Sequence, residues 1–179
     1  MTPAQYIKTG SDESYTYPNL VKVIKPFIDK FAASRGGNIT IWCPFDKEWS
    51  NYVKLFKEWG YNVIHSHIDD GKDFFTYQPE ESWDIIVSNP PFKNKALFFT
   101  RALSFNKPFA LVAPVTWLND GTPNKLFMDS GVELIIPNRR AKFFNTEGNV
   151  IGNRPSFKSV YFCKWLCTKE INFVDMEKE

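Results

Sequence analysis

The apolar residues in the first third of the chain follow a helical period twice, with a short continuous apolar run between the two stretches. The first stripe predicts an amphipathic helix that Pro26 should kink or split and that Gly36-Gly37 ends. Residues 39–43 read as a buried strand, and the second stripe predicts a helix that Asp46 can cap and Gly60 stops. The stripes are Leu20, Val23, Ile24, Phe27, Ile28 and Phe31, then Tyr52, Val53, Phe56 and Trp59.

The remainder of the chain continues this alternation. Strands that alternate with helices imply crossover connections and a parallel sheet, and two closing strands joined by a long loop imply an antiparallel hairpin at one edge. The predicted fold class is therefore α/β, with a mostly parallel central sheet, that edge hairpin and helices on both faces. The predicted strands are residues 61–65, 83–88, 108–113, 132–136 and 159–166, with a turn at 69–71 and a helix over 94–105.

Length and composition fit one folded domain, residues 1–179. Hydrophobic residues make up 43% of the chain and charged residues 23%, which is typical of a globular protein. The net charge of +2 exerts little pull on a polyanion, so nucleic-acid binding requires a local basic patch. The acidic stretch 169–179 is expected to be loose.

Three cysteines occur, an odd number, and no CxxC motif is present. If Cys163 and Cys167 share a strand, they lie roughly 13 Å apart, which a disulfide cannot span. We therefore expect reduced thiols in a cytoplasmic protein. The first residues contain no signal-peptide apolar run, and no stretch is long enough to span a membrane.

The chemistry-bearing motif is Asn89-Pro90-Pro91-Phe92, which follows directly on the predicted strand 83–88. Two prolines cannot continue a central strand and stiffen the turn that leaves it. The side-chain oxygen of Asn89 and the carbonyl oxygen of Pro90 can converge as two acceptors on the two N–H donors of an amino group attached to a base. Phe92 supplies a face for stacking. The alternative is a purely structural role, in which Asn and Pro only form a turn.

This motif resembles the Asn-Pro-Pro-aromatic motif of phage-type adenine N6 methyltransferases. The resemblance implies a Rossmann-like methyltransferase fold, S-adenosyl-L-methionine as cofactor, and Asn89, Pro90, Pro91 and Phe92 as catalytic residues. It also implies that residues 1–35 form a segment and helix that close over the cofactor, with contacts from Tyr15 and Thr16.

The resemblance extends to a cofactor site. Asp73-Phe74 resembles the acidic-aromatic pair that binds the adenine of the cofactor, and the resemblance implies that Asn89 also contacts the cofactor. The alternative for Asp73 is a solvated turn carboxylate. The stretch after the first strand departs from the family, because it has no glycine-rich turn. There the resemblance implies cofactor contacts from Cys43, Pro44, Phe45 and Asp46. Asp46 or Glu48 could bind the ammonium of the cofactor, or either could cap a helix.

The second strand ends without the acidic residue that normally holds the ribose hydroxyls, although Asp69 and Asp70 follow closely. His65 and His67 would point the same way if the strand continues, which permits a metal pair, but no third ligand is evident. We predict no metal site.

Basic residues interleaved with phenylalanines follow the motif and fill the late loop. We predict that Lys93, Arg139 and Arg140 contact the nucleic-acid substrate. The alternative is a solvated surface over core phenylalanines. The other basic residues in these two places are Lys95, Arg101, Lys142, Arg154 and Lys158.

The leading functional prediction is methylation of adenine in DNA, with the base flipped out or single-stranded. Methylation of adenine in RNA uses the same chemistry. A glutamine methyltransferase is a third reading, which Phe92 mildly disfavours. A non-catalytic protein that kept the fold and binds nucleic acid or a host protein is the alternative from another class, and the missing glycine-rich turn supports it.

Overall fold

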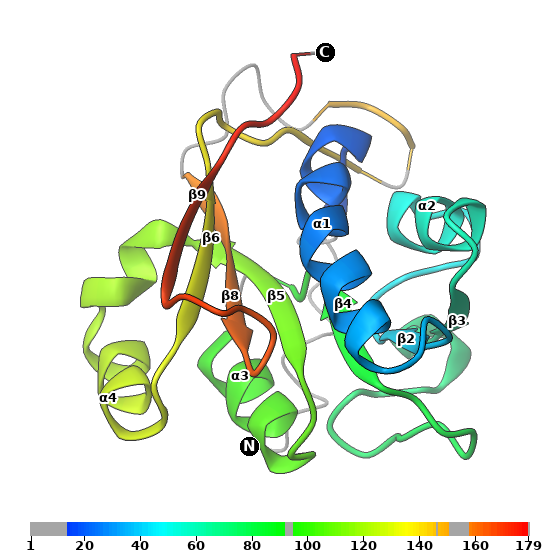
Figure 1. The fold of residues 1–179 in the computed structure, drawn as a ribbon, viewed down its shortest axis with the longest axis horizontal. Coiled ribbons are helices and arrows are strands. Elements are labelled where there is room, and N and C mark those ends of the chain that lie inside the picture. The colour runs from blue at the N-terminus through cyan, green and yellow to red at the C-terminus, as the bar shows by residue number, and fades with distance from the viewer. Residues whose placement is uncertain (1–13, 92–94, 146, 151–157, 179) are drawn as a thin grey trace.

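A seven-stranded sheet forms the centre of the molecule, in the strand order β3-β2-β4-β5-β8-β6-β9. The computed structural model describes residues 14–91, 95–145, 147–150 and 158–178. Figure 1 shows β9 beside β6 at one end of the sheet and β3 at the other. The strands are β2 (Thr40–Cys43), β3 (Asn62–His65), β4 (Ile85–Ser88), β5 (Phe109–Pro114), β6 (Glu133–Pro137), β8 (Ser159–Lys164) and β9 (Ile171–Val174), and a separate pair joins β1 (Tyr15–Thr16) to β7 (Phe143–Phe144).

Helices cover both faces of this sheet. Residues of α1 (Pro18–Ser34) and α2 (Asn51–Glu58) share one buried cluster with Ile41 and Cys43 of β2. Residues of α3 (Lys95–Ser104) and α4 (Gly121–Ser130) share a second buried cluster with Trp42, which lies between Ile41 and Cys43 in β2. Successive side chains of a strand point to opposite faces, so β2 contributes to two cores. Short 3₁₀ turns, η2 (Ile68–Asp70) and η3 (Val115–Asn119), complete the elements that the structure describes.

A buried hydroxyl pair ties the first core together. The hydroxyl groups of Tyr52 on α2 and Tyr161 on β8 lie 2.9 Å apart, and the Tyr161 hydroxyl donates to the carbonyl oxygen of Leu20 on α1 at 3.0 Å. Buried polar groups need such partners, and this chain of bonds joins three elements that are distant in sequence.

The predicted fold class is confirmed: the structure is α/β and Rossmann-like. The predicted pairing of the two late strands is also present, because β6 and β8 are antiparallel. However, this pair does not form the edge. Strand β8 lies between β5 and β6, and β9 adds a parallel partner on the outside of β6.

The expectation of a loose stretch over 169–179 was wrong. Strand β9 pairs with β6 from Leu134↔Ile171 to Pro137↔Val174, and Met176 beyond it is 3% exposed. An edge strand carries unpaired backbone groups, and the run Ile-Asn-Phe-Val has residue types that favour an extended chain. The acidic composition of the stretch hid this short strand.

The structure decides two points that the sequence left open. Helix α1 is not split, because it runs from Pro18 to Ser34 with Pro26 on an exposed position. The carbonyl that proline leaves without a donor can there bond to water. Cys163 and Cys167 do not share a strand, because β8 ends at Lys164 and the chain turns at Trp165. Both cysteines are free thiols, and burial raises the pKa of Cys163, as does its hydrogen bond with Cys167.

Over the described residues, no helix is both long and apolar enough to cross a membrane.

Candidate functional site

The loops that carry the predicted site meet at one edge of the sheet. Strands β3, β2, β4 and β5 run parallel to one another, so their carboxyl ends lie together. Strand β6 also ends there, because two antiparallel pairings through β8 restore the direction of β5. Ligands of open α/β sheets bind outside the carboxyl ends of the strands. Arg139 and Arg140 follow β6 and thus lie on this same edge.

Asn89 stands at the point where β4 ends, with its amide held in one orientation. Its Nδ2 donates to the carbonyl oxygen of Ser14 at 2.9 Å. Its Oδ1 is buried and accepts no hydrogen bond from the residues that the structure describes. Pro90 beside it is buried and Pro91 is half-buried. An unsatisfied buried acceptor costs free energy, so this atom offers a ready partner to a donor that enters the site. Phe92 and Lys93 lie outside the described residues.

The N-terminal segment lies against this motif, held there by a small two-stranded sheet. Tyr15 pairs with Phe144 and Thr16 with Phe143, which joins the beginning of the described chain to the late loop. The Tyr15 ring lies 4.3 Å from the ring of Trp49. Both Tyr15 and Thr16 are almost fully buried, so their side chains pack rather than face solvent.

Asp46 lies under the motif rather than at the start of a helix. It is 4% exposed and accepts a hydrogen bond from the hydroxyl of Ser88, the residue that precedes Asn89. Burial raises the pKa of Asp46 to about 6, and hydrogen bonds from Ser88 and Ser50 lower it. A carboxyl group that titrates near neutral pH beside a candidate site is a typical feature of functional sites, although structural networks produce it too.

The helix-cap reading of Asp46 and Glu48 was wrong. Ser50 caps α2, where its side chain accepts a hydrogen bond from the backbone N–H of Val53 at 3.4 Å. Glu48 instead pairs with Lys57 at 2.6 Å and with Nε2 of His65 at 2.8 Å. The sequence Asp-Lys-Glu-Trp-Ser offered several residues that can cap, and only tertiary contacts distinguish them.

The side chains of the loop after β2 differ in exposure: Phe45 is half-buried, whereas Glu48 and Trp49 are exposed. Cys43 and Pro44 are both buried. The ring of Phe45 lies 4.9 Å from that of Phe74 and 5.0 Å from that of Phe98. A contact of Cys43 with a ligand would therefore involve main-chain atoms.

The Asp73-Phe74 pair has a structural role in this conformation. One carboxylate oxygen of Asp73 accepts the backbone N–H of Phe75 at 2.9 Å, which stabilises the turn. Phe74 is 3% exposed and packs 5.4 Å from Trp42. The ring of Phe74 thus belongs to the second core, and the half-buried Phe75 lies nearer to the surface.

The end of β3 carries two histidines and two carboxylates. Strand β3 stops at His65, so the premise that His65 and His67 share a strand face was wrong. Nδ1 of His67 accepts the backbone N–H of Asp69 at 3.2 Å, and Asp69 also pairs with Lys47. Asp70 is exposed. Within the described ranges, no three His, Cys, Asp or Glu side chains gather as metal ligands do.

The two arginines predicted to contact substrate are exposed beyond β6. Nε of Arg139 donates to the carbonyl oxygen of Met176 at 2.9 Å. This bond uses one of the guanidinium N–H donors, and the others can bind a further acceptor.

Four residues of this site were missed by sequence reasoning. Ser14 orients Asn89, Ser88 and Ser50 bind Asp46, and Trp49 packs on Tyr15. Serine and tryptophan carry no spacing signal in a single sequence, and Ser14 acts through its backbone carbonyl, which any residue type provides.

No protein-family model and no curated protein matches this sequence. Among solved structures, the chain is similar to the modification subunit of a putative type I restriction enzyme from Vibrio vulnificus YJ016, at 11% identity and a TM-score of 0.49 over 96% of this chain. It spans about half of that subunit, 49% of its length. It is also similar to the release-factor-specific protein-(glutamine-N5) methyltransferase from Alicyclobacillus acidocaldarius subsp. acidocaldarius DSM 446, at 14% identity and a TM-score of 0.41, covering 92% of this chain and 98% of that one. At such identities the likeness concerns the fold and assigns no activity to this chain.

Proposed function

We propose that this chain is an S-adenosyl-L-methionine-dependent methyltransferase that acts on the exocyclic amine of adenine in DNA. The observation that supports this most is the amide of Asn89. Its Nδ2 is fixed by Ser14, so its buried Oδ1 is directed away from that bond and has no partner among the described residues. An amine donor would satisfy this acceptor.

The role proposed for the motif follows from the electronic structure of the amine. The nitrogen lone pair of adenine is delocalised into the ring, so the amine is a poor nucleophile. Asn89 accepts one amine hydrogen and the Pro90 carbonyl accepts the other, which pulls the nitrogen toward tetrahedral geometry. Phe92 stacks on the base, which must be extruded from a duplex or single-stranded to reach the motif.

The cofactor would supply an electrophilic methyl group. The residues present fit it in part. The exposed carboxylate of Asp70 follows β3, where ribose hydroxyls are held in folds of this kind, and Phe45 offers an aromatic ring after β2. No glycine lies between Cys43 and Gly60, so main-chain approach in the first loop is less close than glycine would permit. Oδ1 of Asp73 binds the backbone N–H of Phe75 in the turn, and its other carboxylate oxygen could accept a hydrogen bond from the adenine amine of the cofactor.

The DNA substrate is proposed from the motif and from the basic residues on the same edge. Arg139 and Arg140 would contact the phosphate backbone, and Lys93 is proposed from its place next to the motif. The described elements are a seven-stranded sheet with its helices and a two-stranded sheet. Sequence specificity from these elements is expected to be short or absent, or to be supplied by a partner.

The test is transfer of labelled methyl to DNA, RNA and protein, with the product identified by mass spectrometry. We expect Asn89→Ala to abolish transfer and to leave cofactor affinity, measured by calorimetry, nearly unchanged. The matched control is Asn38→Ala, an exposed asparagine that accepts a hydrogen bond from Asn62 at 2.9 Å.

Each outcome has a definite meaning. Wild-type transfer by Asn89→Ala would refute the role of the motif. Methylation of RNA alone, or of a protein glutamine alone, would change the substrate class. A wild-type protein that neither binds the cofactor nor transfers methyl would be a non-catalytic relative of the fold.

A further inference from the structure

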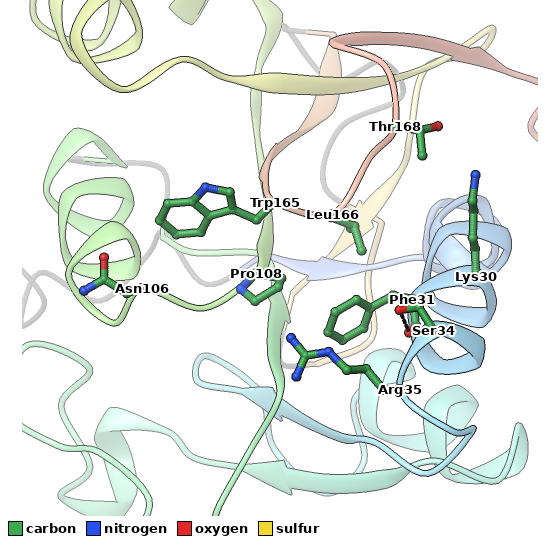
Figure 2. Close-up of a pocket in the computed structure, with 9 residues that line it drawn as sticks. All are labelled: Lys30, Phe31, Ser34, Arg35, Asn106, Pro108, Trp165, Leu166 and Thr168. Atoms are coloured by element: carbon green, nitrogen blue, oxygen red, sulfur yellow. Dashed lines mark hydrogen bonds between the residues drawn. The ribbon is translucent and has the colours of Figure 1, made fainter.

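A cavity of about 550 Å³ opens on the opposite edge of the sheet from the candidate methyl-transfer site. Pro108 lines it and directly precedes β5, so the cavity lies at the amino end of that strand. The volume falls within the range of about 300–1,000 Å³ that is usual for small-molecule sites. Its walls include the end of α1 and the turn after β8, with side chains of Lys30, Phe31, Arg35, Asn106 and Trp165 (Figure 2).

The backbone around this cavity is unusual in two places. Among the described residues, only Asn106 and Trp165 have a positive φ without being glycine, at 52° and 56° respectively, and both line the cavity. Asparagine adopts this conformation at little cost, whereas for a bulky residue it is an outlier. Strained residues persist where the surroundings hold them, and they cluster at ligand sites.

Glu133 holds the turn that presents Trp165. Its carboxylate accepts the backbone N–H groups of Trp165 at 2.9 Å, Leu166 at 3.0 Å and Cys167 at 2.7 Å. Three bonds from consecutive amides to one carboxylate fix the turn and maintain the left-handed conformation. Trp165 nevertheless remains 46% exposed. The hydrogen bonds to Glu133 therefore hold the turn in a conformation in which the aromatic side chain of Trp165 is exposed to solvent.

Positive charge lies across the cavity from this ring. Figure 2 shows the guanidinium of Arg35 extending toward Pro108, with Trp165 and Asn106 on the other side of Pro108. Arg35 also lies over the ring of Phe31, 5.2 Å from its centre. Lys30, five residues earlier and within α1, is exposed and forms no ion pair with the residues that the structure describes.

We propose that this cavity binds a nucleotide unit, with its base stacked on Trp165 and its phosphate held by Arg35 and Lys30. Base stacking on an exposed aromatic ring and phosphate binding by cations are the two components of nucleotide recognition without sequence preference. The amide of Asn106, which also lines the cavity, can both donate to and accept from a base edge. A free nucleotide and one nucleotide of a single strand share this chemistry. The inference goes beyond the proposed function and does not depend on it.

The test uses the full chain labelled with 5-fluorotryptophan and observed by fluorine NMR. The sequence contains six tryptophans, and the Trp165→Phe variant identifies the Trp165 resonance. Guanosine 5′-monophosphate, guanosine, inorganic phosphate, a short oligothymidylate and an acidic peptide are titrated separately. Guanine is chosen because it carries a carbonyl oxygen where adenine carries the amine that the proposed cofactor site would recognise.

We expect the monophosphate to shift the Trp165 resonance and to bind more tightly than guanosine or phosphate alone. Trp165→Ala should weaken binding by at least roughly fivefold, and Arg35→Ala by at least roughly tenfold, with loss of the preference for the monophosphate over guanosine. The matched controls are Trp59→Phe and the removal of an exposed charge on α2, Lys54→Ala. Glu133→Gln should move the Trp165 resonance and weaken binding, while Trp59 stays unchanged.

The two sources of the nucleotide are separated by the oligothymidylate arm. Tighter binding of the oligonucleotide than of the monophosphate assigns the cavity to a strand, and the reverse assigns it to a free nucleotide. Equal binding of the acidic peptide, or saturation of the monophosphate without any shift at Trp165, would overturn the proposal. Because no methyl transfer is measured, failure here leaves the proposed function untouched.

Discussion

Replacement of the buried carboxylate Asp46 by asparagine should stabilise the protein at neutral pH and not at acid pH. Asp46 has a pKa of about 6 when folded, against an ordinary value of 3.8. Because the folded pKa is the higher one, Asp46 contributes its full stability below pH 3.8, and that contribution is lost as the pH rises through about 6. An asparagine side chain at this position would keep an oxygen for Ser88 and cannot ionise.

The magnitude follows from the two pKa values. They differ by roughly two pH units, which corresponds to about 3 kcal/mol for a fully buried group. For a chain of this size such a difference raises the melting temperature by about 6–12 °C. The gain should be small near pH 4, grow between about pH 4 and 6, and reach a plateau above about pH 7.

The assay is chemical denaturation of wild type and Asp46→Asn at a series of pH values. Asp129→Asn is the matched control, because Asp129 is a 66% exposed carboxylate near Lys125 and should change stability by no more than about 0.5 kcal/mol. A difference between wild type and Asp46→Asn that does not vary with pH would refute the reasoning. A stabilising result would indicate that the chain keeps Asp46 for its site rather than for its stability.

Three further predictions follow from the described contacts. Phe74→Ala should reduce the free energy of unfolding, measured by denaturation, by about 3–5 kcal/mol. An unchanged stability would favour the predicted role of Phe74 in cofactor binding over its role in the core. Deletion of residues 169–179 should lower the melting temperature, because β9 and Met176 pack on β6, and a truncated chain that melts like wild type would show the stretch to be dispensable. Neutralising Arg139 and Arg140 together should reduce the salt slope of DNA binding by about two, and an identical slope would make them surface charges only.

The sequence predicted the alternation of strands and helices because apolar periodicity is a local property. The strands β2 to β6 lie within two residues of their predicted bounds, and Gly36-Gly37 ends α1 as expected. Helix α4 was missed, since its only buried apolar side chain beyond Pro123 is Phe127 and no stripe marks it. The position of β8 between β5 and β6 depends on pairing across the whole sheet, which periodicity does not record.

The site was predictable where residue type decides the chemistry and unpredictable where contacts decide it. The motif at Asn89 identified the loop that the structure places at the carboxyl edge beside Asp46. Which residue capped α2, and whether Phe74 faced a ligand or the core, depended on tertiary packing of interchangeable residue types. Ser14 could not be found at all, because its contribution is a main-chain oxygen.

The place of β8 in the sheet also governs the order in which this chain can assemble during synthesis. Strands β2 to β5 are complete when the ribosome has passed Pro114, but the outer side of β5 pairs with β8, which begins only at Ser159. Until β8 has paired, β6 has no neighbouring strand in the sheet. The unpaired backbone groups of β5 can then pair with another nascent chain. We expect stalling after β5 has emerged from the ribosome, and before β8 has emerged, to favour aggregation more than stalling at any earlier point.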